Sequence, residues 1–312
     1  MASIRPLLAL RAGFLALVSL LAACAPSAAP STVLEVASPN LSLPTVNDLF
    51  SVTPVSTTFA DSYAERSPQA SSNFFQDMLS APRRDDGRFV LAPGWYVLEA
   101  ESFCLQAGTH GPSQGDGYLP APLRGDREAI VYRILSSYAG RVPQQDAQVL
   151  LWAILARTRY SDMPANVQRT AATLLSPQQL LELNGGALGS IPDGVWRELE
   201  RQVPAGLRQV YAAERQLRNQ LLQANSNYQS LENIAILAGA APAATLSRNV
   251  AQGQWAQHPE GYFIRYLPRG YRQTRVEVYV AEREVLLDLS ATLATPANTS
   301  AQRLGLGTPA QR

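Results

Sequence analysis

Residues 87–158 read GRFVLAPGWYVLEAESFCLQAGTHGPSQGDGYLPAPLRGDREAIVYRILSSYAGRVPQQDAQVLLWAILART. Two short runs rich in β-branched and aromatic residues, 89–91 and 95–98, flank the turn signal Ala-Pro-Gly. This pattern predicts a β-hairpin. Residues 108–125 follow, with five glycines and three prolines. A loop of this length is more often functional or flexible than a simple connection.

Helical patterns fill the rest of this stretch and continue beyond it. After residue 126, Ile130, Ile134 and Tyr138 fall on one face of a predicted helix. Residues 143–158 predict a second helix that is apolar all round, which is typical of a helix buried at the centre of a domain. The longest periodic segment is 205–238, where the sequence Asn-Ser-Asn at 225–227 is a possible break into two helices.

The period changes again near the C-terminus. Residues 262–267 and 274–280 predict a hairpin, since Val276, Val278 and Val280 alternate with polar or aromatic neighbours. We therefore predict an α+β fold, a mainly helical body with a small antiparallel sheet from short strands near 88–104 and 262–280. The predicted organisation is a signal peptide at 1–23, a lipidated flexible tether at 24–86, a globular body at 87–290 and a disordered tail at 291–312.

The N-terminus has the pattern of a bacterial export signal. Arg5 and Arg11 precede an apolar run that ends Leu21-Ala22-Ala23-Cys24. This ending resembles the lipobox of bacterial lipoproteins, which implies cleavage before Cys24 and attachment of palmitate-type acyl chains to it. The resemblance implies a protein anchored in a cell-envelope membrane on the exported side, and Ala25 favours the outer over the inner membrane. The alternative is an ordinary secretory signal with a chance cysteine.

The composition excludes several classes of function. The 26 basic residues, all arginine, nearly balance the 25 acidic ones and form no basic block, so nucleic-acid binding is not expected. His110, His258 and Cys104 show no metal-binding spacing, so we expect neither a metal nor a cofactor. Glu99 and Glu101 lie two apart on a predicted strand and are expected to be solvated carboxylates rather than a glycosidase pair.

Cys104 has no partner in the chain once Cys24 is lipidated. An unpaired cysteine in an exported protein can be a free thiol, can form a disulfide bond to another chain, or can have a specific chemical role. Phe103-Cys104-Leu105 and the later run Ala147-Gln148-Val149-Leu150-Leu151-Trp152 resemble bacterial surface thioester domains. The resemblance implies that Cys104 and Gln148 form an internal thioester that captures host amines. Three features depart from that family: Ala147 replaces its usual threonine, the spacing between the elements is compact, and its members are chiefly anchored to cell walls whereas this chain has a lipobox.

Three hypotheses about function remain open. The first, which we take as the expectation, is a non-catalytic, lipid-anchored envelope protein that serves as scaffold or binding subunit of an envelope complex, with Cys104 an inert buried thiol. The second is a thioester-type surface adhesion module built on Cys104 and Gln148. The third is a thiol hydrolase with Cys104 as nucleophile and His110 or His258 as base.

Overall fold

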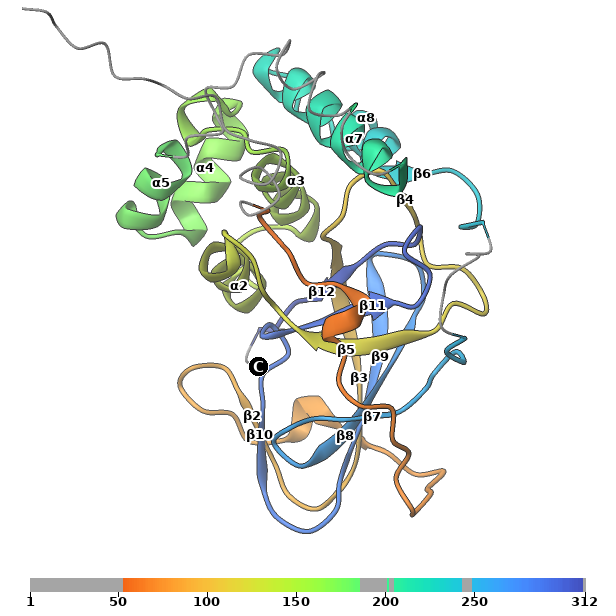
Figure 1. The fold of residues 1–312 in the computed structure, drawn as a ribbon. Helices are drawn as coiled ribbons and strands as arrows, with labels where there is room; N and C mark the ends of the chain where they lie inside the picture. The colour runs from red at the N-terminus through yellow and green to blue at the C-terminus, as the bar shows by residue number, and fades with distance from the viewer. Residues whose placement is uncertain (1–52, 186–200, 202–204, 243–248, 311–312) are drawn as a thin grey trace, which may run out of the picture. The chain divides into compact units, whose positions relative to one another are not determined.

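A large, curled antiparallel sheet dominates the described part of the chain, which comprises residues 53–185, 201, 205–242 and 249–310 of a computed structural model (Figure 1). All of these residues belong to one unit, Pro44–Arg312. Seven strands follow one another in the order β5-β11-β12-β3-β9-β8-β7, and the eighth, β1, pairs in parallel with β3. The prediction of a mainly helical body with a small sheet is therefore wrong.

The bounds of these eight strands, in chain order, are as follows. They are β1 Gln76–Asp77, β3 Gly94–Cys104, β5 Tyr118–Pro122, β7 Ala256–Gln257, β8 Tyr262–Pro268, β9 Gln273–Val280, β11 Thr292–Pro296 and β12 Leu304–Leu306. Two further two-stranded ladders pair β10 (Val285–Leu287) with β2 (Phe89–Leu91), and β4 (Thr109–His110) with β6 (Ile236–Leu237).

The centre of the sheet follows from side-chain alternation. In β3, Tyr96, Leu98 and Ala100 are buried while Glu99 and Glu101 point to solvent. β3 pairs antiparallel with β9 from Gly94↔Val280 to Glu101↔Gln273, so the predicted pairing of the two strand regions is confirmed. The predicted β8–β9 hairpin is also confirmed.

The sheet is nearly closed because the chain from residue 63 to 66 lies between its two ends. The backbone N–H of Tyr63 donates to Pro120 O in β5, and that of Arg66 donates to Trp255 O beside β7. Val55, Thr57 and Met78 are buried as well. Residues 53–86 are therefore part of the fold and not a flexible tether; the remainder of the predicted tether, residues 24–52, lies outside the described residues.

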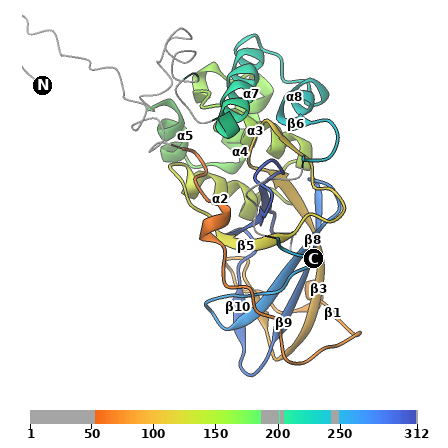
Figure 2. The ribbon, with the colours of Figure 1, turned by 45° about the vertical axis from the view of Figure 1, so that its right-hand side comes forward.

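Six helices lie among the described residues and gather at the end of the sheet where β3 finishes (Figures 1 and 2). They are α2 Glu128–Ser137, α3 Gln144–Leu155, α4 Ala165–Leu174, α5 Pro177–Asn184, α7 Ala205–Leu222 and α8 Tyr228–Ala235. The break predicted at 225–227 is confirmed, because Asn227 caps α8 by accepting from Ser230 N. None of the helices described is long and apolar enough to cross a membrane.

The hydrophobic core has two main parts. One fills the interior of the curled sheet and includes Tyr96, Tyr262 and Tyr266. The other joins Phe103 and Cys104, at the end of β3, to the buried faces of the helices. α3 lies at the centre of this second part with every residue from Ala147 to Leu155 buried, which confirms the prediction of a central buried helix.

Three local predictions are wrong. β2 pairs with β10 rather than with β3, so residues 89–98 form no hairpin. The Gly/Pro-rich segment 108–125 contains the buried strand β5. The tail predicted to be disordered forms β11 and β12, whose residues are all buried. Proline and glycine in these strands, together with burial of both faces, remove the alternating pattern by which strands are recognised.

Candidate functional site

Cys104 and Gln148 are in direct contact in the structure. The last residues of β3 pair with β12 on one side, where Cys104 lies opposite Leu304, but β9 ends its pairing with β3 at Glu101. On that vacated side the Gln148 side chain takes the place of a strand. Its Oε1 accepts from the backbone N–H of Cys104 at 2.8 Å, and its Nε2 donates to the Cys104 carbonyl at 3.1 Å.

The helix explains why this glutamine points inward. In the buried run Ala147–Leu155, only Gln148 and Trp152 have side chains that can form hydrogen bonds. Gln148 is 2% exposed. A buried amide is costly unless its donor and acceptor are satisfied. Here Cys104 satisfies both. One turn earlier, Gln144 makes a similar but more exposed connection, donating to the carbonyls of Ser102 and Arg272.

The sulfur of Cys104 lies in the core. The thiol is wholly buried, and this burial raises its pKa to about 11. Among the described residues, the buried side-chain atoms Trp152 Nε1 and Gln302 Oε1 have no hydrogen-bond partner, so neither bonds to the sulfur. Such unpaired polar atoms are uncommon in protein cores.

A chain of hydroxyl groups lies on the solvent side of Trp152. The Tyr228 ring of α8 packs on the Trp152 ring with centroids 5.4 Å apart, and its hydroxyl lies 2.6 Å from that of Tyr271 in the β8–β9 turn. The Tyr271 hydroxyl in turn donates to Glu232 Oε1. Both tyrosines are half-buried, so this chain lies between the buried Trp152 ring and the surface.

The two histidines do not accompany Cys104. His110 lies in β4, where its Nδ1 is 3.2 Å from Gly239 O. His258 stacks on Tyr262 with ring centroids 4.3 Å apart and meets Tyr63 edge to face. Burial lowers the His258 pKa to about 4. No group of three or more potential metal-ligating side chains occurs among the described residues.

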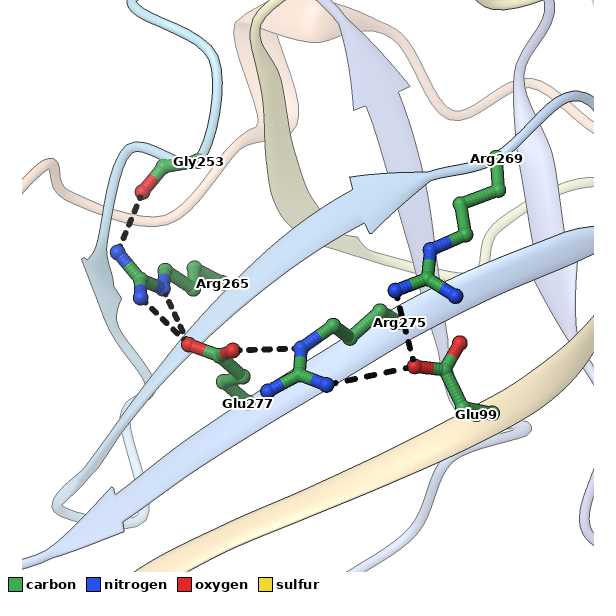
Figure 3. Close-up of polar contacts among 6 residues, drawn as sticks. All are labelled: Glu99, Gly253, Arg265, Arg269, Arg275 and Glu277. Atoms are coloured by element: carbon green, nitrogen blue, oxygen red, sulfur yellow. Dashed lines mark hydrogen bonds and ion pairs between the residues drawn. The ribbon is translucent and has the colours of Figure 1, made fainter. Parts of the chain in front are cut away.

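The outer face of the sheet carries a ladder of charges that sequence reasoning missed (Figure 3). Glu277 is 3% exposed and is held between Arg265, at 2.5 Å, and Arg275, at 2.7 Å. Arg275 and Arg269 also reach Glu99, at 3.4 and 3.5 Å. The available signal was the cross-strand register, which sets Arg265 opposite Glu277 and Glu99 opposite Arg275.

A cavity of about 360 Å³ opens beside this ladder. Its lining includes Glu99, Glu101, Tyr138 and Gln144. Neither Cys104 nor Gln148 lines it, and both are closed off from solvent. Glu99 and Glu101 therefore belong to a surface hollow and not to the site around the thiol.

Comparison of the chain with protein-family models, with curated proteins and with solved structures finds no significant match. The lipobox at residues 21–24 lies outside the described residues. The site is therefore defined by its own geometry: a buried thiol, and a carboxamide that hydrogen-bonds the backbone of the same residue.

Proposed function

We propose that this protein is a lipid-anchored binding module of the cell envelope, and that it captures its partner through an internal thioester between Cys104 and Gln148. The observation that carries the proposal is the pair of hydrogen bonds between the Gln148 side chain and the backbone of Cys104, 44 positions away in the sequence. These two residues belong to the two motifs by which the sequence resembles surface thioester domains. The lipid anchor rests on the resemblance of residues 21–24 to a lipobox.

The chemistry needs no cofactor. The Cys104 sulfur attacks the Gln148 side-chain carbonyl carbon, forming a C–S bond as the C–N bond breaks. The thiol proton leaves with the nitrogen as ammonia, so the step neither oxidises nor reduces either residue. The hydrogen bond from Nε2 to the Cys104 carbonyl is given up with that nitrogen. Burial raises the pKa of the thiol and therefore opposes formation of the attacking thiolate while the site is closed.

A buried thioester suits a capture function. The apolar core excludes water, which would otherwise hydrolyse the bond. A primary amine from the partner then attacks the carbonyl carbon of Gln148, leaving an amide to Gln148 and a free thiol on Cys104. Capture of this kind requires the helical layer and the end of β3 to part locally, since both residues are closed off at rest.

A second candidate is favoured by a specific observation. The Gln148 amide is fully satisfied by Cys104, and the thiol has a raised pKa and no exposure. These features suit an inert core thiol in a scaffold or binding subunit that acts without a covalent bond. The same features argue against a thiol hydrolase, for which neither His110 nor His258 contacts the thiol in the described residues.

Intact mass measurement distinguishes the candidates. The native wild-type protein is expected to weigh less than its mature sequence by one ammonia. Gln148→Ala should have its full calculated mass, while Gln144→Ala, altered one turn away on the same helix face, should keep the deficit. A wild-type protein of full mass would contradict the thioester and leave the non-covalent binding module as the function.

A further inference from the structure

The surface hollow beside the charge ladder is lined by two carboxylates and by no basic side chain. Its volume of about 360 Å³ lies within the range of small-ligand sites in proteins. The carboxylates are those of Glu99 and Glu101, and the other polar side chains of the lining belong to Tyr138 and Gln144. The rest of the wall consists of small apolar residues, glycine and proline. This composition favours a cationic ligand that carries a short apolar chain.

The two carboxylates differ in how far their charge is compensated. Glu99 is held by Arg275 and Arg269, at 3.4 and 3.5 Å, as part of the ladder (Figure 3). Glu101 is exposed and makes no ion pair within the part of the chain that the structure describes. The hollow therefore keeps the uncompensated negative charge of Glu101.

The hydroxyl group of Tyr138 is a second, independent sign of a ligand. Only 3% of this residue is exposed, and its ring meets Phe103 edge to face with centroids 4.9 Å apart. Among the described residues its hydroxyl has no hydrogen-bond partner, yet it is not one of the unpaired polar atoms that are wholly buried. The hydroxyl is therefore reached from the hollow that Tyr138 lines. Burial and, after it, the Glu101 carboxylate raise the pKa of this phenol, so it remains protonated.

The end of α2 and the start of α3 make the hollow more favourable for a cation. α2 ends at Ser137, and the next three residues, 138–140, line the hollow. The carbonyl groups at the C-terminus of a helix carry partial negative charge, which stabilises a cation. Gln144 donates through Nε2 to the carbonyls of Ser102 and Arg272, and its Oε1 is left as an acceptor.

We propose that this hollow binds an alkylammonium group, the group carried by a lysine side chain or by a small primary amine. A primary ammonium has three N–H donors and no acceptor, which suits a site with the Glu101 carboxylate, Gln144 Oε1 and the Tyr138 oxygen. A metal ion suits it less well, because the hollow offers only two carboxylates and no larger group of metal-ligating side chains occurs among the residues described. The inference does not depend on the thioester, since neither Cys104 nor Gln148 lines the hollow.

The test is a calorimetric titration of the full-length protein with n-butylammonium chloride at pH 6. Alkylammonium groups have a pKa of about 10.4, so at this pH the probe is protonated and cannot act as a nucleophile. We expect saturable binding with a Kd of about 1 mM and no binding of n-butanol, which has the same chain without the charge. An unchanged intact mass after the titration shows that no covalent adduct contributes.

Substitutions in the hollow should weaken this binding to different extents. Glu101→Gln should raise the Kd about 10-fold, as expected for a lost charged hydrogen bond, and Tyr138→Phe about 5-fold. Glu99→Gln should raise it less than about 3-fold, because the charge of Glu99 is already paired. Tyr132→Phe and Glu128→Gln are the matched controls, since both residues belong to α2 but do not line the hollow, and they should bind as the wild type does.

Absence of saturable n-butylammonium binding to the wild type would overturn the proposal, and so would an unchanged Kd in Glu101→Gln. Glu101 is exposed, so its glutamine variant is expected to fold, and Tyr138→Phe removes a single oxygen atom. A parallel titration with Nα-acetyl-lysine methylamide assigns the source of the group. Binding of both probes assigns the hollow to a lysine of a partner protein, and binding of n-butylammonium alone assigns it to a small amine. The mass deficit that tests the thioester is a separate measurement, so either proposal can fail without the other.

Discussion

Gln148 hydrogen-bonds both backbone polar groups of Cys104, occupying the position that a neighbouring strand would take beyond the end of β9. In a Cys104→Ala background, where no thioester can form, replacing Gln148 with alanine therefore leaves a buried N–H and a buried C=O without a partner. Each such group costs about 1–3 kcal/mol. We expect Gln148→Ala to lower the free energy of unfolding by about 2–4 kcal/mol in chemical denaturation.

Gln144→Ala is the matched control for this substitution, since Gln144 also donates to backbone carbonyls but is half-buried. We expect a loss of about 1 kcal/mol, because water can replace the partner. If both variants lost the same free energy of unfolding, the hydrogen bonds of Gln148 would contribute no more to stability than those of Gln144.

The charge ladder makes a second prediction. Glu277 is nearly buried between Arg265 and Arg275, whereas Glu99 is exposed and its ion pairs are longer. Removing one charge from a buried pair is costly, but surface pairs contribute little. Glu277→Gln should lower unfolding free energy by about 2–3 kcal/mol, and Glu99→Gln by less than about 1 kcal/mol. The reverse order, measured by denaturation, would contradict this account of the sheet's outer face.

His258 makes a third prediction. Burial lowers its pKa from 6.5 to about 4, so between these values the unfolded chain binds a proton that the folded protein does not. The stabilising effect is fully present above pH 6.5 and is lost as pH falls towards 4. Because His258 is partly exposed, we expect the free energy of unfolding to fall by only about 1–2 kcal/mol as the pH is lowered through this range.

Stability measured against pH in two variants checks this assignment. His258→Gln should remove that part of the pH dependence, while His110→Gln should leave it in place. Persistence of the full slope in His258→Gln would assign the acid sensitivity to other groups.

The lipid anchor gives a fourth prediction. Cys24→Ala removes the acylated residue of the lipobox, so the variant should carry no lipid and should leave the membrane fraction on washing with high salt. Ser72→Ala, at a distant polar position, serves as the control and should stay in the membrane fraction. A Cys24→Ala protein that remains fully membrane-bound would show that another feature anchors it.

Sequence reasoning succeeded where one local pattern decides the structure. The central helix α3 is apolar on all sides, and the valines of β9 alternate, so both elements were predicted. β5, β11 and β12 were missed because Tyr118–Pro122 and Thr292–Pro296 contain proline and Leu304–Leu306 contains glycine, and because their burial leaves no polar face. Missing these strands made the sheet seem small and the tail disordered.

The site was predictable only in part, for a similar reason. Cys104 and Gln148 were singled out by a resemblance, and their contact depends on how α3 crosses the end of β3. Tyr228, Tyr271 and Glu232 lie in a helix and a hairpin turn that are separate in sequence. No short motif signals a hydroxyl chain that forms only when tertiary packing brings such segments together.

The most direct test of the thioester is the number of free thiols that appear when the purified mature protein, acylated at Cys24, is unfolded rapidly in the presence of an alkylating reagent. We predict that the native protein does not react, that the rapidly unfolded wild type still shows no free thiol, and that unfolded Gln148→Ala shows one. Appearance of one full equivalent of thiol from the freshly unfolded wild type would contradict the Cys104–Gln148 bond.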